Sequence, residues 1–462
     1  MEAVTVPRRY VAVIALGTLL NPLNSSMIAV ALVGLQDAFG VGFGTASWLV
    51  SGFYLAACVG QPLMGRIADR FGPRRVYVAG LAIVCVASAL APLSPGFGAL
   101  LLCRIVMAIG TSAAFPAGLA LIRRTAAASR AGASGGESTR PPAAALGTIA
   151  VANSASAAFG PVLGGFLVAF VGWQGIFLVN VPLTLVTLVL ALTVLPADGP
   201  ADRRGSSLLR VVDPLGVLLF SGTLISLLGF LLALPNRPLW ILLPVLAACG
   251  VLLVVWELRT ATPFLDVRGF VASPALAGVL GQQAAIQVVF YGVFYGLPMW
   301  LEEVRGFPTE RSGLLMLPVA ALGVLVTPVA ARLVTRFGPR LPLLLGSVGL
   351  LAGSLLLLTL DDGTPVVGIL GVAAVMGLPN GLNNMGLQAA LYSAAPPEST
   401  GVAAGLFQTA RYVGAILSTA LIGLLLSPDL SSRGLHRVAV VISALAVLLV
   451  VAAVVGNRRR AR

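Results

Sequence analysis

The chain is a succession of long apolar segments separated by short polar connections. Each segment has about 20 residues, the length that an α-helix needs to cross a hydrocarbon core of about 30 Å. Apolar residues run continuously through each segment, whereas the strands of a membrane barrel alternate polar and apolar positions. We therefore predict an all-α integral membrane protein. Its fourteen predicted helices cover approximately residues 10–33, 45–64, 76–93, 98–122, 143–170, 174–195, 212–234, 239–258, 273–300, 311–331, 342–360, 365–391, 400–427 and 437–456.

One charged connection occurs twice. Residues 65–75 read GRIADRFGPRR and residues 331–341 read ARLVTRFGPRL, and six of the eleven positions are identical. Each copy precedes the third helix of a group of six. The repeat predicts two six-helix bundles, residues 1–200 and 262–462, with two extra central helices and linkers at 201–261. Twelve helices, with one weak pair misidentified, is the alternative.

Composition agrees with a membrane protein and predicts its orientation. Hydrophobic residues make up 58% of the chain and charged residues 10%, with a mean hydropathy of +1.00. All 29 basic side chains are Arg; with the N-terminus inside, 22 fall in inner connections and five in outer ones, as the positive-inside rule requires. We expect both termini in the cytoplasm and the protein in the cytoplasmic membrane. Topology explains the net charge of +13, so we expect no nucleic-acid partner.

Missing residue types exclude several kinds of chemistry. Without Lys the chain has no Walker lysine for ATP hydrolysis and no Schiff-base lysine. Cys58, Cys85, Cys103 and Cys249 are isolated in apolar segments, and His436 is the only histidine. We therefore expect no catalytic residues, no metal site and no cofactor. A channel or a scaffold would have no use for the duplicated halves.

Polar side chains within the predicted helices are candidate substrate contacts. Two Arg residues fall well inside apolar segments, where a charge costs at least about 2.5–3.5 kcal/mol unless it faces the bundle interior. Amides and tyrosines recur at i, i+4 spacing on two other helices, so each set shares a face. Hydrogen bonding between helices is the alternative role for each of them. The candidate substrate-binding residues are Asn24, Arg104, Gln283, Gln287, Tyr291, Asn380, Asn384, Gln388, Gln408 and Arg411.

Two motifs are candidate gating elements. In the repeated connection, glycine permits a tight turn, and Asp69 can cap the next helix or pair with an arginine as a latch that forms when the inner side closes. A turn that only orients the protein is the alternative. In segment 156–165, Pro161 stands among glycines at a spacing that permits a bend or plain close packing. The candidate gating residues are Gly65, Asp69, Arg70, Gly72, Arg74, Gly160, Pro161, Gly164, Gly165, Arg336, Gly338 and Arg340.

These motifs resemble those of the major facilitator superfamily. Segment 65–75 looks like its signature loop, 101–110 like its fourth-helix motif, and 156–165 like its fifth-helix exporter motif. Segment 173–182 is similar to the entry of helix 6 in the fourteen-helix drug:proton antiporters. The resemblance implies a major facilitator fold and multidrug efflux. That family usually carries an acidic residue in its first helix where this chain has Asn24, so the resemblance does not extend to the usual proton-coupling carboxylate.

The expected function is secondary active export of small amphipathic compounds by alternating access. Uptake or facilitated transport of a polar metabolite without proton coupling is the alternative. Carboxylates such as Asp37, Glu302 and Glu303 fall at the edges of the apolar segments, so an interior with Arg and amides should prefer neutral, zwitterionic or anionic amphiphiles. The expected partners are this small-molecule substrate and the lipid bilayer, with protons as a candidate coupling ion. We expect a monomer.

Overall fold

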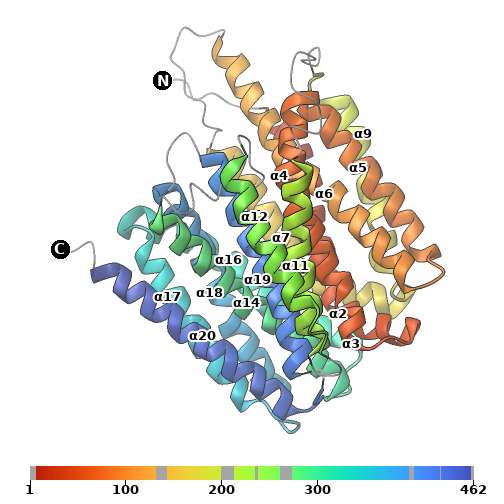
Figure 1. Cartoon of the computed structure of the whole chain (residues 1–462), viewed down its shortest axis with the longest axis vertical. Helices are drawn as coiled ribbons and strands as arrows, with labels where there is room; N and C mark the ends of the chain where they lie inside the picture. Colours follow the sequence, from red (N-terminus) through yellow and green to blue (C-terminus); the bar gives the residue numbers. More distant parts are fainter. Residues whose placement is uncertain are drawn as a thin grey trace.

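The computed structural model describes residues 7–131, 143–198, 213–234, 238–260, 273–394, 400–426 and 428–458. Every regular element within these ranges is a helix, which confirms the all-α prediction. Thirteen helical segments of the described chain are long and apolar enough to cross a membrane. Helix α19 (Thr400–Leu425), with 26 residues, would be the fourteenth. The helices lie side by side in a bundle (Figure 1).

Two sets of helices flank a central pair along the chain. The first set is α1 (Arg8–Thr18), α2 (Leu20–Phe39), α3 (Phe43–Ala46), α4 (Trp48–Phe71), α5 (Pro73–Leu90), α6 (Phe97–Ala131), α7 (Ala143–Val171), α8 (Gly175–Leu178) and α9 (Asn180–Val194). The central pair is α11 (Pro214–Ala233) and α12 (Leu242–Arg259). The second set is α14 (Pro274–Glu303), α15 (Thr309–Leu315), α16 (Leu317–Phe337), α17 (Arg340–Leu356), α18 (Val366–Ala394), α19 and α20 (Ser432–Arg458).

The predicted first helix consists of two pieces, α1 and α2, which meet at Leu19. The interruption lies three residues before Pro22, because proline has no N–H group to donate to the carbonyl four residues earlier, that of Thr18. Helix α6 continues to Ala131, well beyond its predicted end near residue 122.

The two sets of helices pack in the same way. In the first set α2 packs against α7, α4 against α6, and α5 against both α6 and α9. In the second set α14 packs against α19, α16 against α18, and α17 against both α18 and α20. Corresponding helices therefore have corresponding partners, and we call the sets the first half (α1–α9) and the second half (α14–α20). The predicted domain boundaries near residues 200 and 262 lie outside the described residues.

The halves meet in three places. Helix α4 packs against α19, α7 packs against α15 and α16, and α2 packs against α14. Since α4 corresponds to α16 and α19 to α7, the first two contacts are related by the internal repeat. The third joins the equivalent first helices of each half, as a pseudo-twofold arrangement requires.

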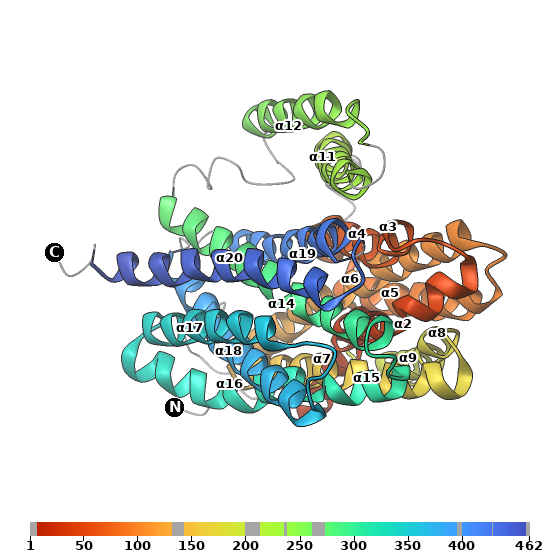
Figure 2. The same cartoon turned by 90° about the horizontal axis from the view of Figure 1, so that it is seen from below.

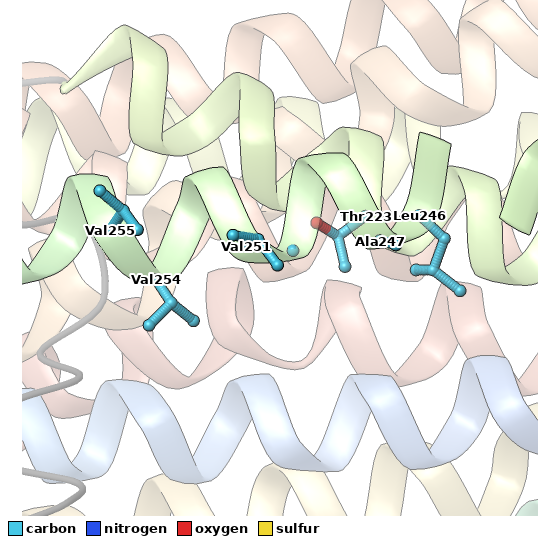
Figure 3. Close-up of a pocket in the computed structure, with 7 residues that line it drawn as sticks. Thr223, Leu246, Ala247, Val251, Val254 and Val255 are labelled. Carbon is cyan, nitrogen blue, oxygen red and sulfur yellow. The ribbon is translucent and has the colours of Figure 1, made fainter. Parts of the chain in front are cut away.

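Helices α11 and α12 stand beside this assembly (Figure 2). Helix α11 contacts α4 and α19, while α12 packs mainly on α11. The Asp213 carboxylate joins the pair, because it caps α11 at the Gly216 N–H and accepts a hydrogen bond of 2.8 Å from Trp256 Nε1. A shallow groove of about 450 Å³ between them is lined by Thr223, Leu246, Ala247, Gly250, Val251, Val254 and Val255 (Figure 3). This apolar groove borders neither half.

Each half carries one copy of the charged connection, between α4 and α5 and between α16 and α17. Gly72 and Gly338 both have positive φ, at 101° and 76°, so the repeated glycine supplies a backbone conformation that other residues rarely adopt. We call the end of the bundle with these connections the basic end and the opposite one the far end. Helix α4 thus runs from Trp48 at the far end to Phe71 at the basic end.

Gly72→Ala should lower the free energy of unfolding by about 1–3 kcal/mol. The methyl group would impose strain at φ 101° and would collide with the Asp198 side chain. Thermal unfolding of the detergent-solubilised protein measures the effect. Gly371→Ala is the control, because Gly371 has open space around it and no positive φ. Equal melting temperatures for the two variants would contradict the role assigned to Gly72.

Candidate functional site

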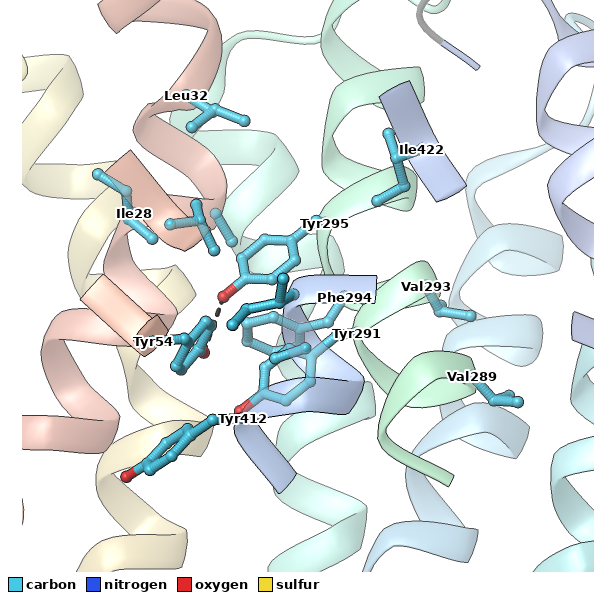
Figure 4. Close-up of a cluster of buried hydrophobic side chains, with 14 of the residues drawn as sticks. Ile28, Leu32, Tyr54, Val289, Tyr291, Val293, Phe294, Tyr295, Tyr412 and Ile422 are labelled. Carbon is cyan, nitrogen blue, oxygen red and sulfur yellow. Dashed lines mark hydrogen bonds between the residues drawn. The ribbon is translucent and has the colours of Figure 1, made fainter. Parts of the chain in front are cut away.

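Four tyrosines from both halves meet where α4 faces α14 and α19 (Figure 4). The Tyr54 ring stacks on the Tyr412 ring with 5.4 Å between centroids and lies 5.5 Å from the Tyr291 ring. The Tyr54 and Tyr295 hydroxyls form a hydrogen bond of 2.9 Å between the halves. Each of the four side chains is at most 5% exposed. We call these residues the tyrosine cluster; it is a desolvated aromatic junction between the two halves.

The contacts of α4 with the second half follow one helical face. Ser51, Tyr54, Cys58 and Gln61 are spaced at i, i+3, i+7 and i+10, so they share that face. Ser51 shares a hydrogen bond of 2.7 Å with Thr419, and Gln61 Nε2 donates one of 2.6 Å to the Tyr412 hydroxyl. Sequence reasoning did not select these α4 residues, although their polar periodicity was the available signal.

Arg411 lies at the tyrosine cluster, as a candidate substrate-binding residue should. Its guanidinium group is half-buried and interacts electrostatically with Tyr291, Tyr412 and Tyr54. The side chains that interact with Arg411 are tyrosines. No carboxylate is among its interacting groups in the described part of the chain. The side chain therefore places a positive charge beside four aromatic rings.

Arg104 is bound within the first half. Its guanidinium donates to the Leu49 carbonyl at 3.2 Å and to the Asn24 carbonyl at 3.4 Å, and it stacks 4.5 Å from the Phe53 ring centroid. These are the contacts of a structural arginine. One nitrogen, Nη2, is buried without a hydrogen-bond partner among the described residues, so a substrate role for Arg104 stays a prediction.

Asn24 is paired with an amide that the sequence did not identify as its partner. Asn24 Nδ2 donates to Asn180 Oδ1 at 2.8 Å, and Asn180 Nδ2 donates back to Asn24 Oδ1 at 2.9 Å. Both side chains are at most 2% exposed. This reciprocal pair joins α2 to α9 inside the first half, where each amide satisfies the other.

The candidate amides of the second half lie on α14, α18 and α19. Gln283 and Gln287 are buried on α14, and Gln287 packs against Gly414 of α19. Gln408 is partly buried on α19, three positions before Arg411. The candidates of α14 and α19 thus lie on neighbouring helices.

The polar residues predicted to share one face of α18 have different neighbours. Gln388 donates a hydrogen bond of 2.9 Å to Asn384, while Asn380 packs against Gly323 of α16. Asn383 is 1% exposed, lies against Gly346 of α17, and has no hydrogen-bond partner among the described residues. Part of this stripe therefore serves contacts between helices of the second half.

The first charged connection ties together helices of the first half. Asp69 is exposed and lies near Arg123 and Arg124 of α6. Another residue, Asp198, caps α5 by accepting from the N–H groups of residues 74 and 75 at 3.2 and 2.8 Å, and it forms an ion pair of 3.7 Å with Arg124. The cap that Asp69 was a candidate to provide thus comes from Asp198, which lies far along the chain.

The remaining members of the two connections have local contacts. Gly65 lies where a Cβ would touch Pro116 of α6. The Arg74 side chain donates to backbone carbonyls near the end of α9. Arg70 and Arg336 each pack over the phenylalanine that follows them, and Arg340 begins α17. The gating role of these residues stays a prediction.

The glycines of segment 156–165 serve two interfaces. Gly160 and Gly164 face Ser26 and Met27 of α2 within the first half. On another side of α7, a Cβ on Gly165 would lie 2.9 Å from the Thr309 carbonyl oxygen, and a Cβ on Gly313 would lie 2.5 Å from that of Pro161. Helices α7 and α15 therefore touch backbone to backbone across the halves, near the far end.

The chain is similar to known transporters in sequence and in fold. Residues 14–419 match the family model of the Major Facilitator Superfamily. The chain is 36% identical to the uncharacterized MFS-type transporter YwoD of Bacillus subtilis (strain 168), over 92% of this chain and 91% of that protein. It is 30% identical to the tetracenomycin C resistance and export protein of Streptomyces glaucescens, over 90% of this chain and 75% of that protein.

Solved structures share the fold. A bacterial homologue of the human lysosomal transporter Spinster, in an inward-facing and occupied conformation, matches with a TM-score of 0.66 at 16% identity, covering 98% of each chain. The nucleoside transporter NupG matches with a TM-score of 0.64 at 14% identity, covering 97% of this chain and 99% of that one.

The paired amides predict a measurable coupling. Asn24→Ala and Asn180→Ala should each destabilise the protein by about 1–3 kcal/mol, because each leaves the other amide buried without its partner. The double variant should cost less than the sum, with a coupling near 0.6 and at most about 1.7 kcal/mol. Unfolding in a double-mutant cycle measures this coupling. Strict additivity would show that the two amides act independently.

Proposed function

The chain belongs to the major facilitator superfamily, and from that premise we propose that it is a secondary active exporter of small amphipathic compounds that works by alternating access. Members of this family are transporters rather than enzymes. The observation that supports the proposal most is the tyrosine cluster with Arg411, because it lies between two copies of one bundle. That is where duplicated transporters place their substrate.

Alternation requires contacts between the halves that can form and break. The described contacts of α4 with the second half run from Ser51 to Gln61, which covers the far-end part and the middle of that helix. Helices α7 and α15 also touch near the far end. The polar contacts among these are hydroxyl, amide or backbone junctions, so separation exposes groups that water can solvate. In the proposed orientation the basic end faces the cytoplasm, and the structure represents a state closed on the outer side.

The chemistry of the junction favours aromatic and anionic compounds. When Tyr54 and Tyr412 move apart, each loses a stacking partner that a planar aromatic compound can replace. Arg411 supplies a positive charge beside these rings. The tetracenomycin C resistance and export protein and the multidrug resistance protein Stp of Mycobacterium tuberculosis, which is 28% identical over 90% of this chain, support export as the direction.

The remaining parts of the proposal concern organisation. We propose that residues 1–200 and 262–462 are the two moving bundles and that residues 201–261 form a peripheral pair of helices. We further propose that the protein works as a monomer with both termini in the cytoplasm.

Arg411→Ala should reduce flux of an anionic aromatic dye by about 10- to 150-fold, because a hydrogen bond to a charged group is worth about 1.5–3 kcal/mol. The assay is transport of fluorescein in proteoliposomes under an imposed pH gradient, with trapped dye collected by filtration and read at one fixed pH. Rhodamine 123 is the cationic control dye. Arg437→Ala is the control variant, because Arg437 is an exposed residue whose partner is Asp429.

Movement of fluorescein through the wild-type protein from the basic end to the far end, against the concentration gradient of the dye, supports export. Net flux in the opposite direction would favour the uptake alternative. Equal fluorescein flux in wild type and Arg411→Ala would remove Arg411 from the substrate site.

Gly165→Val should hinder closure at the far end while leaving each half folded. The added side chain would enter the contact with α15, where even a Cβ would lie 2.9 Å from a carbonyl oxygen. Access of a membrane-impermeant thiol reagent to a cysteine placed at Ser51 measures closure, and we expect faster labelling. Gly371→Val on α18 is the control, because Gly371 has open space. Unchanged labelling would mean that the α7–α15 contact does not control the far end.

A further inference from the structure

A carboxyl group lies beside the contact between the halves at the far end. Glu302 is near the end of α14, and its Oε2 accepts a hydrogen bond of 3.3 Å from the Thr309 hydroxyl, the first residue of α15. Its other oxygen, Oε1, is shielded from solvent and has no hydrogen-bond partner among the described residues. One oxygen of this carboxyl is thus bound to α15, and the other has no hydrogen-bond partner among the described residues.

A second unsatisfied group lies next to it. Ser312 of α15 is 0% exposed, and its hydroxyl lies beside the Glu302 carboxyl without completing a hydrogen bond. The shielded Oε1 thus receives no hydrogen bond among the described residues that would stabilise a negative charge on this carboxyl. The geometry therefore fits a protonated carboxyl better than a charged one.

The surrounding charges point the same way. The charged groups that act on Glu302 are Glu303 beside it on α14 and Glu310 on α15, and both are acidic. The arginines of the same connection have other partners: Arg305 donates to the carbonyls of residues 361 and 364, and Arg311 packs 4.5 Å from the Phe307 ring.

Helices α2, α7 and α16 add no described cation near this contact. In α7 the segment 159–171 has no ionisable residue, and α16 has none from 317 to 331. At this end of α2 the ionisable residue is the exposed acid Asp37. Helix α20, which packs against α14, begins with Arg433, His436 and Arg437; the His436 ring is hydrogen-bonded to the Leu360 carbonyl, and Arg437 pairs with Asp429. A negative charge on Glu302 would therefore meet two like charges and no counterion among the described residues near it.

The position of Glu302 links its proton to the contact. Thr309, Glu310 and Gly313 are the residues of α15 that touch α7 at Gly165 and Pro161. When α15 leaves α7, water reaches the Glu302 carboxyl, and a hydrated carboxyl ionises below neutral pH. Closing the contact reverses this and favours proton uptake.

We infer that Glu302 is a proton-binding site whose proton passes to water on the far side when the contact between α7 and α15 opens. This inference rests on the proposed function, because it assigns a proton to one step of alternating access. It also places the site on the second half, away from the first-helix position that Asn24 occupies.

One proton released on opening makes the equilibrium pH-dependent. The ratio of open to closed protein should rise by up to about tenfold per pH unit while Glu302 is neutral in the closed state and ionised in the open state. High pH on the far side therefore favours opening, and low pH favours closure. Glu302→Gln, which is neutral at every pH, should stay closed and show no such dependence.

The test measures the distance between spin labels on the two helices. Labels replace the exposed residues Phe170 of α7 and Leu314 of α15 in a full-length chain whose four native cysteines are changed to alanine, reconstituted in nanodiscs from pH 5 to pH 9. Glu303→Gln is the matched control: it removes one of the two like charges near Glu302, so it should keep the pH dependence and move its midpoint to lower pH. Amide hydrogen exchange of residues 309–315 in the chain with its native cysteines, corrected for the intrinsic pH effect, repeats the measurement without labels.

A distance change with pH that disappears in Glu302→Gln and persists in Glu303→Gln supports the site. A pH dependence that persists in Glu302→Gln, or a wild type without any, would overturn it. Neither readout needs a substrate. A wild type that carries no fluorescein but shows the Glu302-dependent distance change would therefore count against the proposed function and leave the proton site standing.

Discussion

The structure depends on how two apolar bundles remain attached through a small number of polar contacts. In lipid no hydrophobic force holds helices together, so packing and hydrogen bonds must do so. Ser51 with Thr419, Tyr54 with Tyr295, and Gln61 with Tyr412 are such bonds between the halves. Each is a neutral pair that water can replace when the halves separate. A strong ion pair at these positions would hold one state too firmly for a transporter that must exchange two states.

Polar side chains inside the first half are likewise held by contacts with neutral groups. Asn24 and Asn180 pair reciprocally and also donate to backbone carbonyls, and Arg104 is held by carbonyl groups and the Phe53 ring. The amide pair means that α2 brings no negative charge to the centre of the first half. Arg411 then meets tyrosine hydroxyls rather than a carboxylate. The positive charge at the junction is therefore left to act on a compound that enters.

Sequence alone predicted most of the fold, while its candidate site residues stay predictions. Hydropathy located the helices, and the repeated RFGPR motif indicated the duplication that the matching helix pairs show. Arg411 and Tyr291 were identified because a charge or a polar stripe in an apolar run is visible locally. Asn180, Asp198 and Glu302 were not, because their importance depends on which distant residue faces them. Asp198, for example, caps a helix that begins more than a hundred positions earlier, and no local pattern records that contact.

The positions of Asn24 and Glu302 suggest how one bundle can compensate for what the other lacks. A carboxyl near the middle of α2 would exchange protons from the cavity itself, whereas Glu302 sits at the far-end contact. A proton bound there acts on the barrier between the cavity and the far side, not on the substrate directly. Such an arrangement lets the pH of the far side bias which state is populated while the cavity keeps its affinity for anions, because the proton and the substrate never compete for Arg411. Selectivity would then reside at Arg411 in the middle of the contact surface, and the pH-dependent gate at Glu302 near its far end.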